Sequence, residues 1–240
     1  MEKKRVDIVN ELKEFYQSEG ILPNEKFDCK NKNECNIRYG QIANGELLAQ
    51  GMQCHVGTKY GENKIKALVV SLDCGGGGAQ NIEERTKSVE IGGTNTHMLG
   101  TTKSISHLLF GDKVDTTKEC LQYYAMTNAC KCCRKNSSNQ LPPFFYEQCN
   151  SYKIKEIEII NPNIIYFQGN SSLNGIHFSN IDNQTTDIFE YLKTISVGDK
   201  NIFAVKCIHP SARGKHVARR NKFYIEMLPK INDYLREKLK

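Results

Sequence analysis

The sequence has no long apolar run. Its longest candidate covers residues 67–72, far short of the ~20 apolar residues that a membrane-spanning helix needs. The N-terminal letters MEKKRVDIVN carry charges but lack the apolar centre of a signal peptide. We therefore expect a cytoplasmic protein with no membrane partner, in a compartment where thiols stay reduced.

The usual nucleotide-binding signatures are also missing. Four consecutive glycines, beginning with Gly75, follow an apolar run and would let a backbone approach a phosphate or a base closely. No Lys-Ser or Lys-Thr pair follows them, which excludes a P-loop, and their spacing differs from the G-x-G-x-x-G of dinucleotide-binding units. A plain flexible turn is the alternative interpretation.

The chain shows neither an internal repeat nor a long linker. Its 240 residues, 39% of them hydrophobic, suffice for one domain with a proper core. We predict a single domain over residues 1–240. It opens with an amphipathic helix over residues 2–18 that stops at Gly20. A cysteine-bearing segment continues to about residue 63, and its lack of clear periodicity suggests irregular structure.

Short apolar runs with strand character alternate with helical patterns through the rest of the chain. This alternation predicts an α/β fold, a three-layer αβα sandwich with a central four-stranded parallel sheet. A proline at position 229 predicts a kink or break in the last helix. The expected strands cover residues 66–72, 123–127, 163–168 and 201–208, and the expected helices cover residues 103–110, 147–160, 186–192 and 221–239.

Unusual residues follow each expected strand. Ligands of open α/β sheets bind outside the carboxyl ends of the strands, so we expect these segments to converge on one crevice. They are Asp73 with the glycines at 75–78, Asn128, Gly169 with Asn170, and His209 with Pro210 and Ser211.

Positive charge gathers near the last of these segments. The formal net charge is +6, and residues 209–222 contain no acidic side chain. These charges either belong to a solvated helix end with no binding role or contact a polyanion. The basic residues are Arg213, Lys215, Arg219, Arg220 and Lys222.

The strings ALVVSLDCG, TNACKC, IIYFQG and HPSAR occur in this order at the expected strand ends. Together they resemble the motif set of the uracil-DNA glycosylase superfamily, and they are most similar to the thermostable type that carries a four-iron cluster. The resemblance covers about residues 60–240. It implies a DNA repair enzyme that flips uracil or another deaminated base out of DNA and hydrolyses its N-glycosidic bond.

The resemblance also implies catalytic roles. Asp73 takes the place of the water-activating Asp, whereas the iron–sulfur type carries a Glu one position earlier, where this chain has Leu72. His209 would donate a hydrogen bond to the leaving base. A helix-capping Asp and a structural His are the alternatives.

By the same resemblance, Asn128 reads the base edge, Met98 occupies the position of a stacking aromatic ring, and the backbone at Gly75 approaches the base. The alternative for Asn128 is a turn-forming residue. The groups expected to grip DNA phosphates are Ser211, Arg213, Lys215, Arg219 and Arg220.

Ten cysteines in a reducing compartment indicate metal or cluster ligands, although several can be small buried hydrophobes. The resemblance implies a structural 4Fe-4S cluster, and zinc is the alternative because thiolates suit both. We read Cys130 and Cys133 as structural. The expected ligands are Cys29, Cys35, Cys132 and Cys149, and Cys54 is an alternative to either of the first two.

We thus expect a monomer that binds DNA containing a deaminated base. Leu72 and Met98 keep a second hypothesis open, in which a cluster-bearing DNA-binding protein keeps the fold with little or no glycosylase activity. A third hypothesis is a zinc-stabilised nucleotide-binding protein unrelated to repair.

Overall fold

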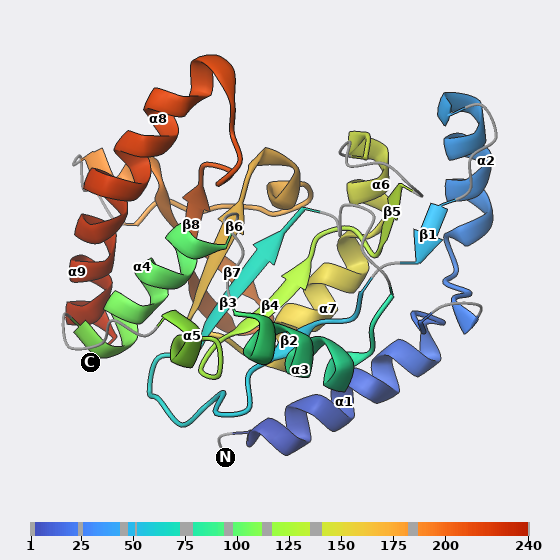
Figure 1. Ribbon diagram of the computed structural model, residues 1–240, viewed down its shortest axis with the longest axis horizontal. Coiled ribbons are helices and arrows are strands. Elements are labelled where there is room, and N and C mark those ends of the chain that lie inside the picture. Colours follow the sequence, from blue (N-terminus) through green and yellow to red (C-terminus); the bar gives the residue numbers. More distant parts are fainter. Residues whose placement is uncertain are drawn as a thin grey trace.

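A computed structural model describes residues 3–23, 26–43, 48–50, 52–72, 79–93, 98–111, 117–134, 141–181 and 187–239. In this part of the chain, six strands form the main sheet in the order β2-β4-β3-β6-β8-β7 (Figure 1). Neighbours among β4, β3, β6 and β8 are parallel, and the edge strands β2 and β7 are antiparallel to them. The bounds are β2 (His55–Val56), β3 (Ala67–Ser71), β4 (Ala125–Asn128), β6 (Ile164–Gln168), β7 (Leu192–Val197) and β8 (Lys200–Cys207).

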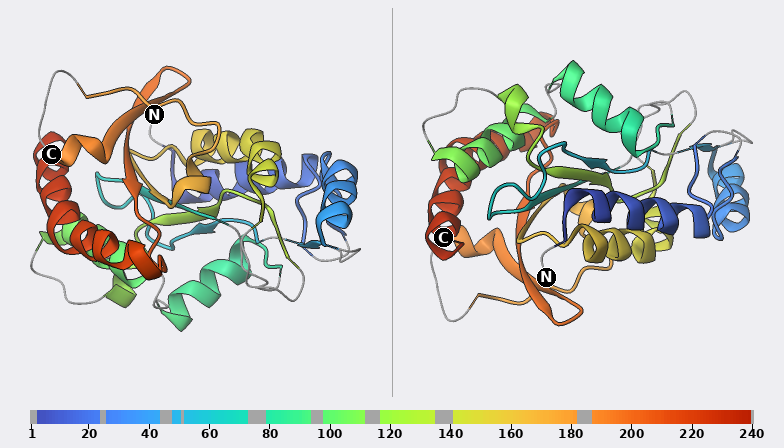
Figure 2. Two further views of the ribbon diagram at one scale, coloured as in Figure 1. Left: turned by 90° about the horizontal axis from the view of Figure 1, so that it is seen from above. Right: turned by 90° about the horizontal axis from the view of Figure 1, so that it is seen from below.

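Helices cover both faces of this sheet. Successive strand residues alternate between two cores: Ile165 and Phe167 belong to one, whereas Ile164 and Tyr166 belong to the other. The first core includes α1 (Arg5–Ser18) and α7 (Asn150–Ile160), and the second includes α4 (Leu99–Phe110) and α9 (Leu228–Lys238). Figure 2 shows these two pairs of helices on opposite sides of the sheet. The prediction of a three-layer α/β sandwich around four parallel strands is therefore confirmed.

Two expectations about individual elements were wrong. The pattern predicted as a helix over residues 186–192 is not an α-helix in its described part, residues 187–192. A single 3-10 turn, η4 (Asp187–Glu190), precedes strand β7, which pairs with β8 through a tight turn where Gly198 has φ +56°. The cysteine-bearing segment is also less irregular than expected. It contains α2 (Lys32–Ala43) and β1 (Leu48–Gln50), and β1 pairs with β5 (Cys132–Arg134).

The expected helix boundaries hold better at the two ends of the chain. Helix α1 ends at Ser18, and a Cβ at Gly20, whose φ is +64°, would lie 2.3 Å from the carbonyl oxygen of Asp28. The C-terminal helical region contains an irregular turn, which lies just before Pro229 and not at the predicted position itself. A π-helical turn, η6 (Phe223–Met227), separates α8 (Val217–Lys222) from α9, whose first turn contains Pro229.

The remaining described elements are short or lie at the sheet ends. None of the described helices is long and apolar enough to cross a membrane. The helices and turns not yet named are α3 (Ile82–Gly92), α5 (Thr117–Cys120), α6 (Pro143–Gln148), η3 (Asn170–Leu173) and η5 (Gly214–His216).

Candidate functional site

A cleft of about 1360 Å³ lies at the carboxyl ends of the four parallel strands. It has room for a nucleotide, since small-molecule pockets usually measure roughly 300–1,000 Å³. Asp73 and Gly75 lie outside the described residues, so their predicted places in the cleft stay predictions. The expected residues that do line the cleft are Leu72, Met98, Asn128, Gly169, Asn170, His209, Pro210, Ser211, Arg213 and Arg219.

His209 follows strand β8, and contacts within its own loop define its tautomer. The backbone N–H of Ser211 donates to His209 Nδ1 at 3.2 Å, and the Ser211 hydroxyl lies 2.7 Å from the same atom. An amide N–H can only donate, so Nδ1 is an acceptor and the neutral ring carries its proton on Nε2. The imidazole can therefore donate a hydrogen bond through Nε2.

Gly169 supports this ring from the end of strand β6. Its φ is +86°, and a Cβ at this position would lie 3.2 Å from both Cβ and Cδ2 of His209. A side chain would strain the backbone and press on the imidazole. The glycine thus allows the loops after β6 and β8 to pack closely enough to fix the position of His209.

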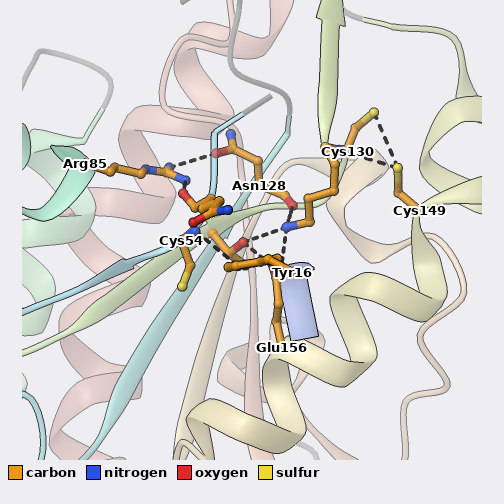
Figure 3. Close-up of polar contacts among 10 residues, drawn as sticks. Tyr16, Cys54, Arg85, Asn128, Cys130, Cys149 and Glu156 are labelled. Carbon is orange, nitrogen blue, oxygen red and sulfur yellow. Dashed lines mark hydrogen bonds and ion pairs between the residues drawn. The ribbon is translucent and has the colours of Figure 1, made fainter. Parts of the chain in front are cut away.

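Asn128 is the last residue of strand β4 and is only 4% exposed. Its Oδ1 accepts a hydrogen bond of 2.7 Å from Nη2 of Arg85, on helix α3. A guanidinium has donors only, so the oxygen must face Arg85 and the NH2 group must point the other way. Figure 3 shows this arrangement, with the amide nitrogen directed away from Arg85.

A buried ion pair lies beneath Asn128. Lys131 Nζ donates to the Asn128 carbonyl at 2.8 Å and lies 2.6 Å from Glu156 Oε2. The Thr127 hydroxyl donates to the same carboxylate oxygen at 2.8 Å, and Tyr16 donates to the other oxygen. Burial raises the pKa of Tyr16, which keeps this phenol a donor. The two charged side chains are 1% and 0% exposed, and the network joins α1, β4 and α7 (Figure 3).

Sequence reasoning missed Arg85 and Glu156. Glu156 occurs within the expected helix over residues 147–160, beside the apolar residues that mark its buried face, and a charge there was a usable signal. Arg85 belongs to helix α3, which the sequence analysis did not predict. Its burial depends on the packing of α3 against β2, which no local pattern reveals.

Polar side chains also connect the middle of the cleft to helix α4. The Ser71 hydroxyl donates to Gln168 Oε1 at 2.8 Å, and Gln168 Nε2 donates to the Thr101 hydroxyl at 2.6 Å. Met98 precedes α4 and lines the cleft, as does Leu72 after β3. Met98 thus contributes an apolar, polarizable side chain to the lining of the cleft.

The predicted phosphate-binding residues fall into two groups. Ser211, Arg213 and Arg219 line the cleft, and Lys215 is exposed in the adjoining turn η5. Arg219 also forms an exposed ion pair of 3.2 Å with Glu190. These side chains form a basic rim at one side of the cleft, which can approach a polyanion.

Arg220, in contrast, contacts its own chain. Its Nη1 donates to the carbonyls of Pro210, at 3.4 Å, and Ala212, at 3.0 Å. The guanidinium thus binds the backbone of the loop after His209 and holds it against α8. This contact provides a structural role for Arg220 beside the predicted one at phosphate.

The four predicted metal ligands are all buried in the same core cluster, together with Cys130. Asn31, between Cys29 and Cys35, donates to the Gln148 carbonyl at 2.7 Å and so joins the first cysteine segment to the Cys149 turn. On the other side, Cys149 Sγ lies 3.9 Å from Cys130 Sγ (Figure 3). The four buried side chains predicted as metal ligands are Cys29, Cys35, Cys132 and Cys149.

Electrostatics also indicate that these thiols are neighbours. Burial, followed by the charge of the Cys149 thiolate, raises the pKa of Cys35 to about 12. The same two effects raise the pKa of Cys29. Among the described residues, no three Cys, His, Asp or Glu side chains are arranged to hold a single metal ion.

Cys54 has a different environment. Its backbone N–H donates to the Tyr16 hydroxyl at 3.2 Å, beside the buried ion pair. Figure 3 places its thiol apart from Cys130 and Cys149. The structure therefore favours Cys29 and Cys35 over Cys54 as companions of Cys149.

Comparison of the chain with models of known protein families finds no match. A search of curated proteins finds no matching relative either.

Proposed function

We propose that this chain is a DNA repair glycosylase that flips uracil or another deaminated base into the cleft and hydrolyses its N-glycosidic bond. One observation carries the proposal. The amide of Asn128 and the imidazole of His209, both fixed by hydrogen bonds, line the same cleft at the carboxyl ends of parallel strands. The order of the sequence motifs adds support.

The chemistry matches these two groups. When the glycosidic bond breaks, its electron pair moves to the base, and the sugar becomes oxocarbenium-like before water adds to it. A neutral His209 can donate a hydrogen bond from Nε2–H to the base oxygen where negative charge grows, and the proton stays on the ring. By the resemblance, Asp73 would position the water; this residue lies outside the described part of the chain.

We also propose a structural 4Fe-4S cluster, held by one segment with two cysteines, the start of β5 and the turn before α7. Buried thiols from distant segments suit iron–sulfur ligation, and zinc is the alternative. The cluster would tie these segments together and take no part in bond cleavage. The proposed ligands are Cys29, Cys35, Cys132 and Cys149.

Metal analysis of protein purified without oxygen tests this assignment. We expect iron and labile sulfide, and one equivalent of zinc without iron would contradict the cluster. Cys149→Ser should lose the metal, while Cys207→Ser, which alters a buried cysteine in the other core, should keep it.

The basic rim supports DNA as the partner. Thiolate ligands need a reducing compartment, which supports a cytoplasmic location. We also propose that the protein acts as a monomer. Gel filtration alone and with a short duplex measures the oligomeric state.

The decisive assay uses an oligonucleotide with one uracil, hypoxanthine or xanthine, followed by cleavage of the abasic site in alkali. We expect excision of at least one of these bases, and His209→Ala should lower its single-turnover rate by at least ~10²-fold. His216→Ala is the matched control, because His216 lies on the exposed rim of the same cleft.

Leu72 in the cleft favours a second candidate, a DNA-binding protein of this fold with no activity, because an apolar side chain replaces the family's carboxylate. DNA binding without excision of any tested base would select this candidate.

A further inference from the structure

Arg85 is a buried cation whose hydrogen bonds reach into the base-binding region. It is 4% exposed and lies on helix α3. Nη1 donates to the backbone carbonyl of Gln53, and Nη2 donates to Asn128 Oδ1 at 2.7 Å. Gln53 is itself anchored, because its side chain donates to the Ile21 carbonyl at 2.8 Å and accepts from the Ile82 amide at 3.2 Å.

These contacts restrict Asn128 to one orientation of its amide. A guanidinium stays charged and cannot accept a hydrogen bond. Turning the amide over would place its NH2 group against the Nη2 donor of Arg85, in a site shielded from water. The lost bond involves a charged donor, so the penalty exceeds that of an ordinary neutral pair.

We propose that Arg85 is a positioning residue that sets base specificity by locking the Asn128 amide; this inference rests on the proposed glycosylase function. The locked amide offers its NH2 group as a donor, while the second lone pair of Oδ1 can accept. The complementary base edge carries a carbonyl oxygen beside a ring N–H. Uracil and hypoxanthine have this edge.

Cytosine and adenine have the opposite edge, with an exocyclic NH2 beside an unprotonated ring nitrogen. Against the locked amide they would place donor against donor and acceptor against acceptor. Arg85 would thereby exclude the normal parent bases through its contact with the Asn128 amide.

Two substitutions separate orientation from general packing. Arg85→Lys keeps a charge that only donates, whereas Arg85→Gln introduces a side chain that both donates and accepts and so tolerates either orientation of Asn128. Single-turnover excision of uracil and of cytosine is measured in the same single-stranded oligonucleotide, which removes differences in base pairing.

We expect Arg85→Gln to lower the uracil-to-cytosine rate ratio by at least ~10-fold, because a buried hydrogen-bonding site discriminates strongly against mismatched polar groups. Arg85→Lys should keep the ratio within about three-fold of wild type, since donor character is preserved. An unchanged ratio in a folded Arg85→Gln protein overturns the inference, as does an equal loss of selectivity in both variants.

Asn128→Asp provides a second route if Arg85→Gln does not fold. One carboxylate oxygen would pair with Arg85, and the other would present only an acceptor to the base. Preference should then move toward cytosine, and retention of full uracil preference would overturn the inference. Wild-type protein that excises none of uracil, hypoxanthine and xanthine defeats the proposed function instead, so the two failures are distinguishable.

Discussion

Glu156→Gln should be among the most destabilising substitutions of similar size in this chain. The carboxylate is fully buried and accepts hydrogen bonds from Lys131, Thr127 and Tyr16. A glutamine offers one acceptor oxygen, and its NH2 group would face a donor. The Tyr16 hydroxyl cannot adapt freely, because it already accepts from the Cys54 amide. Above all, the buried Lys131 would lose the carboxylate that forms its ion pair.

Removing one member of a buried ion pair typically costs about 3–5 kcal/mol of unfolding free energy. The same helix supplies a control, because Lys155 and Glu158 form an exposed pair at 3.0 Å with side chains 52% and 41% accessible. Glu158→Gln should cost at most about 0.5 kcal/mol. A Lys131→Met/Glu156→Leu double variant, which buries no charge, should be more stable than Glu156→Gln.

Urea unfolding followed by circular dichroism measures these differences, with all proteins prepared in the same metal state. The dependence on urea concentration should stay similar between variants, since the surface exposed on unfolding does not change. The reasoning about the buried pair fails if Glu156→Gln and Glu158→Gln lie within about 1 kcal/mol of each other, well inside the expected gap.

Three further predictions follow from the cleft and the core. Gly169→Ala should reduce excision as His209→Ala does, by pressing on the imidazole, while leaving DNA affinity within a few-fold; normal turnover in both variants would contradict the assigned site. An Arg213→Ala/Lys215→Ala variant should bind damaged and undamaged DNA more weakly by the same factor. The slope of log affinity against log salt concentration should become shallower by up to ~0.9 per lost phosphate contact, and an unchanged slope would make these residues ordinary surface. Burial lowers the pKa of His55 to about 3. Between about pH 6.5 and 3 the unfolded state therefore binds one more proton than the folded state, so the contribution of the neutral His55 to stability is fully present above pH 6.5 and decreases as pH falls. His55→Gln should remove about one proton from this slope, and an unaltered slope in urea titrations would refute the assignment.

The sequence was most informative where local patterns coincide with burial. Apolar runs predicted the four parallel strands, and the residues after them predicted one crevice, because both follow from the direction of the chain in a parallel sheet. Prediction failed where long-range packing decides. Leu192 continues a helical pattern, yet it begins β7 because the neighbouring strand β8 offers a free edge. Arg85 acquires its role only through its contact with Asn128, a residue 43 positions away.

The segment Thr127 to Cys132 carries two unrelated tasks within six consecutive positions. Asn128 must face the cleft, while the Lys131 side chain reaches back to the Asn128 carbonyl and the Lys131 amide donates to Cys149 Sγ at 3.4 Å. In the string TNACKC, the number of residues between Asn128 and the cysteines is therefore as important as the identity of the side chains. Inserting or deleting a single residue here would change the number of residues between the cysteines and the Asn128 amide, and no change of side chain could restore it.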